Sequence, residues 1–326
     1  METRGWDAQL RTTAPARRAY RRRSLANLLR MGHCAPAVAQ TVADLSGVDG
    51  EWLVLLAAGL PGGIGDTGFE CGGLSAAVLL LGLRYGDTTS ARGLPVVVEK
   101  GQAYCGRFLG CHRSLTCSAI LGKRRVPLPC VRVVRRAPEL LAETVEEEAS
   151  AAIAADHREA YRWLLAHLTG RGFHCAHAVF RRLAHVVPVT EELLAAACGF
   201  VGGTLLQGMT CSALAAGVMA IGLGAGDVEW SRRRVFRMLG TMAVGGNALA
   251  DGLNEFNRSV NRGKELARTF AAELGSTQCR AVTGCSFSSG ADVERFIAGD
   301  GVARCEAIAV MVAQRAEEII ERARAH

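Results

Sequence analysis

The residues of this chain best suited to chemistry are its cysteines, because many of them recur at matching positions of an internal repeat. The stretch beginning at Gly59, GLPGGIGDTGFECGGLSAAVLLLGLRYGD, returns 140 residues later as GFVGGTLLQGMTCSALAAGVMAIGLGAGD. HCAPAV at His33 returns as HCAHAV at His174. The matched cysteines are four per copy: Cys34, Cys71, Cys117 and Cys130, then Cys175, Cys211, Cys279 and Cys305. Two copies of one unit therefore share a set of thiols.

Four thiols per copy suit either metal binding or thiol redox chemistry. Four cysteine thiolates are the ligand set of an iron–sulfur cluster, and a reactive thiolate beside a second thiol can form and break disulfides. The chain has no CxxC pair, which zinc ribbons and thioredoxin-like motifs use. The sulfurs must therefore converge through folding. Cys71 and Cys211 are the candidate reactive thiols, since each follows a glycine-rich turn and opens a helix, where the helix dipole lowers a thiol's pKa.

Other residues near the matched cysteines have weaker claims. The repeated glycines predict tight turns that shape the site or allow close backbone approach; they are Gly62, Gly63, Gly202 and Gly203. His33 and His174 precede the first cysteine of each copy, and we interpret them mainly as helix-capping or surface residues. The unmatched cysteines are interpreted as buried or incidental: Cys105, Cys111, Cys198 and Cys285.

Composition excludes several classes of protein. The chain has 326 residues, 12 cysteines and a net charge of +7, with its arginines concentrated near the N-terminus. No apolar signal segment follows those arginines, so we expect a cytoplasmic protein with reduced thiols. No aromatic interleaving supports a nucleic-acid partner. Residues 193–226 carry no charge, but glycines and polar residues interrupt the run, and we predict no membrane span.

The apolar spacing predicts an all-α protein built as two tandem copies of a compact helical domain. We expect a basic, mobile leader at 1–30, a first four-cysteine domain at 31–136, a helical linker at 137–165 and a second four-cysteine domain at 166–326. Helices are predicted to start near Cys34 and Cys175, to run from the second cysteine to Gly86 or Gly226, and to close the chain as an amphipathic segment. Ser276 or Thr277 is the expected cap of the helix at Cys279.

The cysteine pattern resembles the redox-active protein family named for its motif C_GCAxxG_C_C. The matching elements are HCAPAV and HCAHAV, ECGGLSA and TCSALAAG, RSLTCSAILG and GSTQCRAVTG, followed by Cys130 and Cys305. Two positions depart from the CGAxxG element, because Ala76 and Ala216 replace its last glycine and Ser212 its first. The resemblance implies a redox role for the four cysteines of each copy.

Three functions remain open at this point. The first is an iron–sulfur or related metal centre held by the eight matched cysteines and used for electron transfer. The second is a metal-free thiol–disulfide oxidoreductase or redox sensor, and the third is a zinc-binding structural or interaction module. The sequence does not decide whether the chain is an enzyme. It identifies no redox partner, and it allows either a homo-oligomer or an intramolecular pseudo-dimer.

Overall fold

The computed structural model describes residues 10–86, 93–122, 128–147, 174–226, 235, 236, 240, 258–287 and 289–325. Across these ranges the chain is all-α, as predicted, and its only β pairing consists of two isolated bridges. Much of the linker and the segment 241–257 lie outside the described residues. Helical predictions for those segments are therefore not tested.

The helices follow the repeat along the chain. The N-terminal half forms α1 (Ala14–Met31), α2 (Cys34–Ser46), α3 (Glu51–Ala57), α4 (Gly72–Tyr85), α5 (Gly93–His112), α6 (Cys117–Leu121) and α7 (Leu128–Glu146). The C-terminal half forms α9 (Cys175–Arg182), α10 (Glu191–Ala197), the short η1 (Cys198–Phe200), α11 (Ser212–Ala225), α13 (Arg258–Leu274), α14 (Cys279–Thr283), α15 (Gly290–Ala298) and α16 (Gly301–Arg324). The predicted helix starts at Cys34 and Cys175, and the C-terminal amphipathic helix, are confirmed.

Most of the basic leader is folded, which corrects the expectation of a mobile segment. Thr13 caps α1 through its side chain, and α1 packs along α2 and α7. Tyr20 and Met31 are buried on its inner face. Two ion pairs, Arg17–Glu143 and Arg21–Glu139, join its outer edge to α7. Residues 1–9 of the leader lie outside the described part of the chain.

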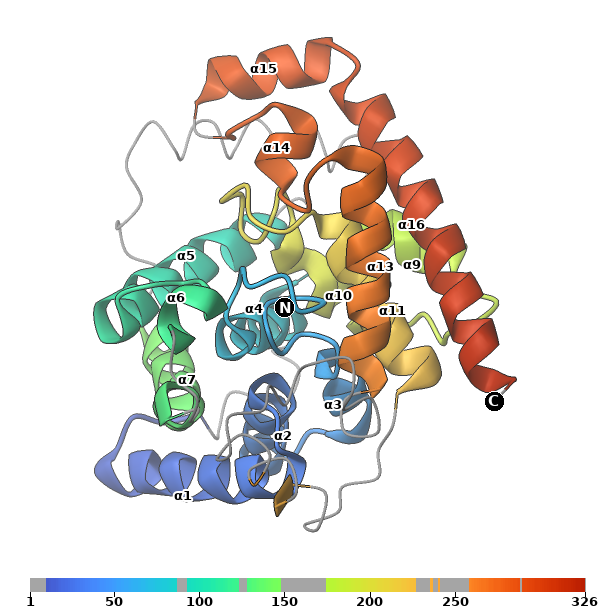
Figure 1. The fold of residues 1–326 in the computed structure, drawn as a ribbon. Helices are drawn as coiled ribbons and strands as arrows, with labels where there is room; N and C mark the ends of the chain where they lie inside the picture. The colour runs from blue at the N-terminus through green and yellow to red at the C-terminus, as the bar shows by residue number, and fades with distance from the viewer. Residues whose placement is uncertain are drawn as a thin grey trace.

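Each repeat packs a short helix against the other repeat, so that the buried residues of both repeats form one continuous core. α3 of the first repeat lies against α11 of the second, and α10 of the second lies against α4 of the first. Matching glycines permit this: a Cβ on Gly59 would lie 2.5 Å from Val218 Cγ1, and one on Gly199 would lie 2.5 Å from Val78 Cγ1. Figure 1 shows α4, α10 and α11 between α1 at one end of the molecule and α15 at the other.

A left-handed turn precedes the second cysteine of each repeat. Five successive residues have positive φ in each copy, 62–66 and 202–206. L-residues in this conformation cost about 1–2 kcal/mol each, yet Thr204, Leu205 and Leu206 all adopt it in the second repeat. Their three side chains are buried, so packing offsets the strain.

Each left-handed turn contacts the long helix of the other repeat. A Cβ on Gly65 would meet the carbonyl oxygen of Gly263 in α13 at 2.7 Å. In the mirror position, Gln102 Nε2 in α5 donates a hydrogen bond to the Leu205 carbonyl at 3.1 Å. The two repeats are thus joined at the segments that lead into their second cysteines.

Within the described residues, no helix combines the length and apolar character needed to cross a membrane. The uncharged stretch 193–226 folds as α10, η1, the left-handed turn and α11. α11 is 14 residues long, which is shorter than the ~20 residues that span a bilayer.

Candidate functional site

A short antiparallel bridge brings the second and third cysteines of the first repeat together. Glu70 pairs with Thr116, so that the residues just before Cys71 and Cys117 lie side by side. The Cys71 N–H donates to the Leu115 carbonyl at 2.8 Å, and the Cys117 N–H donates to the Phe69 carbonyl at 2.6 Å. Local pairing of two loops therefore replaces the CxxC spacing that the sequence lacks.

The first and fourth cysteines reach the same place from two further helices. Cys34 is the first residue of α2, and its Sγ lies so close to Gly72 that a Cβ there would be 2.6 Å away. Cys130 lies in the first turn of α7, whose Val133 packs against Gly73 at the start of α4. The four thiols thus lie at the N-terminal ends of α2, α4, α6 and α7, as the sequence suggested for Cys34 and Cys71.

The second repeat builds the same arrangement. Thr210 pairs with Gln278, the Cys211 N–H donates to the Thr277 carbonyl at 2.8 Å, and the Cys279 N–H donates to the Met209 carbonyl at 2.6 Å.

Cys175 and Cys305 complete this second set from α9 and α16. The cap of α14 is Gln278 rather than the expected Ser276 or Thr277, although Ser276 Oγ accepts a hydrogen bond from the Gln278 N–H at 3.1 Å.

The thiols of each set raise one another's pKa values. Burial raises the pKa of Cys34 well above its ordinary value, and the charges of Cys71, Cys130 and Cys117 raise it further. In the second repeat, burial raises the pKa of Cys279 well above its ordinary value, and the charges of Cys211 and Cys305 raise it further.

At the two cysteines expected to be most reactive, burial changes the thiol pKa more than the helix N-terminus does. Burial raises the pKa of Cys71 to about 12 and that of Cys211 to about 11. Backbone amides of Gly73 and Leu74 oppose the shift at Cys71 without reversing it. The expectation of lowered pKa values at Cys71 and Cys211 is therefore wrong, because desolvation of a buried thiolate is the larger effect.

One pair of thiols differs from the others. Cys175 and Cys305 share a side-chain hydrogen bond, which lowers the pKa of Cys305 and raises that of Cys175. At Cys305, burial opposes this lowering of the pKa and the charge of Arg304 adds to it. The hydrogen bond favours the thiolate form of Cys305 next to the Cys175 thiol.

The repeated glycines shape both sites. A backbone hydrogen bond from Gly62 lowers the pKa of Cys117, although burial raises it to about 11 overall. A Cβ on Gly203, where φ is +72°, would lie 2.6 Å from both Cys279 Cβ and the Met209 nitrogen. Gly63 and Gly202 also have positive φ, +91° and +55°.

Ser212, which replaces a glycine of the CGAxxG element, braces the turn of the second repeat. Its hydroxyl donates to the Phe200 carbonyl and accepts a hydrogen bond from the Gly203 N–H at 3.4 Å. The substitution therefore adds a link between the turn and the start of α11.

Glu70 is a buried residue that sequence reasoning missed. Its carboxylate accepts hydrogen bonds from Thr204 Oγ1 at 2.8 Å, from the Thr210 N–H at 2.8 Å and from Thr210 Oγ1 at 2.5 Å. Thr210 occupies the position of Glu70 in the second repeat, so this contact joins equivalent positions of the two copies. The sequence signal that could have identified this contact is the difference between the two copies at this position, glutamate in the first and threonine in the second.

A pair of buried histidines is a second feature missed from the sequence. The rings of His174 and His177 stack with centroids 4.1 Å apart. Each Nε2 lies against a backbone carbonyl, that of Cys198 at 3.3 Å and that of Leu194 at 2.8 Å. His174 is thus buried rather than a surface residue, and burial lowers its pKa to about 4.

The unmatched cysteines lie outside the two sets of four. Cys105 and Cys198 are buried, Cys111 is exposed, and Cys285 Sγ donates to Asp292 Oδ2 at 3.5 Å. Cys285 also raises the pKa of Cys279, after burial and two matched cysteines. All twelve cysteines are free thiols.

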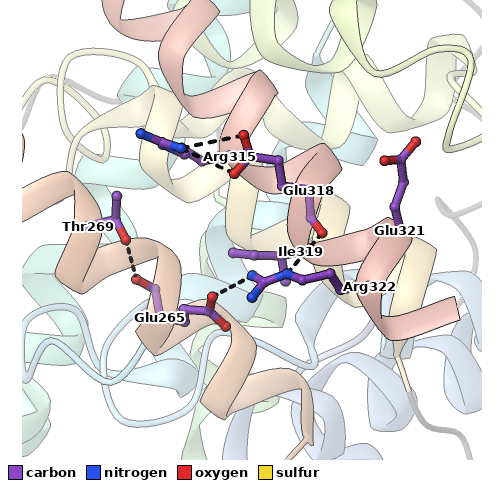
Figure 2. Close-up of a pocket in the computed structure, with 7 residues that line it drawn as sticks. All are labelled: Glu265, Thr269, Arg315, Glu318, Ile319, Glu321 and Arg322. Carbon is purple, nitrogen blue, oxygen red and sulfur yellow. Dashed lines mark hydrogen bonds and ion pairs between the residues drawn. The ribbon is translucent and has the colours of Figure 1, made fainter. Parts of the chain in front are cut away.

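A surface pocket between α13 and α16 has no cysteine in its lining (Figure 2). Most of its charged groups are paired: Arg322 with Glu265 at 2.5 Å, and Arg315 with Glu318 at 3.2 Å. Glu321 is the remaining acidic side chain of the lining. Within the described ranges, no three His, Cys, Asp or Glu side chains surround a single metal-ion position.

Comparison with known families agrees with this geometry. The family model described as "Putative redox-active protein (C_GCAxxG_C_C)" matches residues 32–144 and again residues 173–319. The chain therefore belongs to this redox-active family, and the two matched segments accord with a tandem duplication. Neither the curated proteins nor the solved structures compared with the chain include a match.

Proposed function

We propose that each repeat holds an iron–sulfur cluster through its four matched cysteines, and that the protein transfers electrons. The observation that carries the proposal is the convergence of four free thiols from four helices in both repeats, most of them in or next to the first helical turn. Four thiolates are the ligand number of common clusters. Helix N-termini stabilise negative charge, and a thiolate-ligated cluster is anionic. The free thiols suit a reducing compartment such as the cytoplasm.

The raised pKa values also favour a metal centre over exposed thiol chemistry. Without a positive partner, burial keeps Cys34, Cys71 and Cys279 as neutral thiols, which are poor nucleophiles. Iron ions would supply the compensating charge. Zinc needs its ligands around one point at about 2.3 Å, and the described side chains form no such group. A polynuclear cluster spreads its cysteines around several iron and sulfide atoms.

The residues have separate parts in this proposal. The eight cysteines would bind the clusters, which supply one-electron transfer at each site. Gly62 and Gly203 allow the left-handed turns to approach the third cysteine, and Gly62 also donates a backbone hydrogen bond to its sulfur. Burial of Cys71 and Cys211 excludes water from the sulfurs.

The hydrogen-bonded pair Cys175 and Cys305 favours a second candidate function in the second repeat. The Cys305 thiolate would attack a partner disulfide and form a mixed disulfide. The Cys175 thiolate, after losing its proton, would then displace the partner's thiolate and close a Cys175–Cys305 disulfide, so that two electrons pass to the partner.

Serine substitutions distinguish the two functions. Cys71→Ser and Cys211→Ser are each expected to remove iron and acid-labile sulfide from one repeat. Cys111→Ser, an exposed unmatched cysteine, serves as the control and retains both. If the first two variants kept full iron and sulfide, the ligand assignment would be wrong. If the wild-type chain lacked iron and only Cys305→Ser abolished disulfide exchange, the second candidate would replace the first.

A further inference from the structure

An arginine–leucine stripe on the outer surface of α1 has no partner within the described chain. It consists of Arg18, Arg22, Leu25 and Leu29, which follow the i, i+4, i+7, i+11 spacing of one helix face. Leu25 is 37 % exposed and Leu29 is 51 % exposed. Leu25 and Leu29 lie one turn apart on this face, so they form a small exposed apolar pair beside the two arginines.

The positive charge of this stripe is not neutralised locally. Arg18 and Arg22 make no ion pair with any described residue, whereas Arg17, Arg21 and Arg23 on the flanks are paired with acids. The nearest carboxylates of α7 are occupied by those flanking arginines and by Arg136. Among the described residues, nothing neutralises this charge, which suits an external anionic partner.

Two arginines of α7 that make no ion pair with a described residue extend the surface. Arg132 and Arg135 are exposed on the helix face that also carries Glu139. Glu139 is the residue that Arg21 of α1 contacts at 2.5 Å. This ion pair, whose Glu139 side chain is buried, links α1 to α7.

The stripe ends beside the first cysteine set. Leu29 lies two residues before the end of α1, and Cys34 opens the next helix. Three thiols of the first set are partly exposed (Cys34, Cys117 and Cys130), whereas three of the second set are buried (Cys211, Cys279 and Cys305). The first site is thus the more accessible one, and its Cys34 opens the helix that follows the stripe along the chain.

We propose that the surface formed by the α1 stripe with Arg132 and Arg135 is the docking site for a small acidic redox carrier protein that exchanges electrons with the first cysteine set. This inference rests on the proposed electron-transfer function. Redox encounters bury little surface and depend on opposite charge for rate and orientation. Two half-exposed leucines would supply a small apolar contact within a basic rim.

The observations favour a protein over other anionic partners. The apolar face of α1 is covered by α2 and α7, so α1 has no large apolar face to insert into a lipid surface. The stripe carries no aromatic side chain on which a base could stack.

The test is a binding titration with a plant-type [2Fe–2S] ferredoxin as the acidic probe. We compare the wild-type chain with Arg18→Glu/Arg22→Glu and with a matched control, Arg181→Glu/Arg182→Glu. The control changes the same charge at two exposed residues of α9. We expect the α1 variant to raise Kd about tenfold or more at low salt, and the control to change it about twofold or less.

A second measurement separates failure of docking from failure of the proposed function. The α1 variant is expected to slow reduction by ferredoxin but not reduction by dithionite, which needs no docking surface. If the chain held no iron, calorimetric binding would still decide whether the surface docks the carrier. Equal effects of both variants, no ferredoxin binding at low salt, or binding only to phosphatidylglycerol vesicles would each overturn the inference.

Discussion

Replacing Glu70 by alanine is expected to destabilise the pairing of the two repeats. Glu70 is fully buried and accepts three hydrogen bonds, one from Thr204 and two from Thr210. Its removal leaves three buried donors without an acceptor, and each costs about 1–3 kcal/mol. At about 1.5 kcal/mol per donor, the free energy of unfolding falls by about 4–5 kcal/mol. This is a large share of the ~5–15 kcal/mol typical of folded proteins.

Glu70→Gln is the matched control for this prediction. Glutamine keeps one acceptor oxygen for Thr204 and the Thr210 N–H, and its amide can donate to the Thr210 hydroxyl. We expect it to cost about 1 kcal/mol. Urea denaturation followed by circular dichroism measures both variants. A loss below about 1 kcal/mol for alanine, or equal losses for both variants, would refute the hydrogen-bond argument.

Three further predictions concern the second site. Gly203→Ala places a Cβ against the Met209 nitrogen at positive φ and is expected to remove iron from the second repeat. The control Gly284→Ala, at φ +68° with open space around it, is expected to retain iron. Equal iron retention in both variants would contradict the role of the turn. Burial lowers the pKa of His174 to about 4 and, with His174, lowers that of His177 to about 2, from 6.5. As the pH falls, the two imidazoles of the metal-free chain are protonated in the unfolded state at a higher pH than in the folded state. The free energy of unfolding therefore falls from pH 6.5 towards pH 4 by up to about 1.4 kcal/mol per pH unit per imidazole. Urea titrations at several pH values test this, and a free energy that does not change with pH would exclude it. In the metal-free chain, Cys305 is expected to react with iodoacetamide at lower pH than the other matched cysteines, as mass spectrometry would show; faster reaction of any other matched cysteine would contradict it.

The repeat made much of the helical architecture predictable. Identical spacing around Cys71 and Cys211 predicted the two helices that follow, and glycines at 86 and 226 marked their ends. Each signal is local, because apolar periodicity and terminal glycines act within a few turns. The start of α2 at Cys34 was predictable for the same reason.

The contacts between the repeats were not predictable, because periodicity does not say which copy a helix packs against. The packing of α3 and α10 against the other repeat, and the hydrogen bonds between Glu70 and Thr210, depend on tertiary structure. The left-handed turn of the second repeat was also hidden, since Leu205 and Leu206 are residues that rarely adopt positive φ.

The pKa values of the thiols depended on a competition that sequence could not resolve. Helix position was predicted for Cys71 and Cys211, but the depth of burial was not. Burial decided the direction of the shift, which supports the metal centre over the nucleophilic thiols that the sequence also allowed.

The most direct test of the account is iron and acid-labile sulfide analysis of the full chain purified without oxygen, together with its visible spectrum. The proposed function predicts a brown protein that contains iron and sulfide in equal amounts, bleaches on reduction, and loses about half of both in Cys211→Ser. A colourless protein free of iron and sulfide, after anaerobic expression with iron supplied, would contradict the central claim.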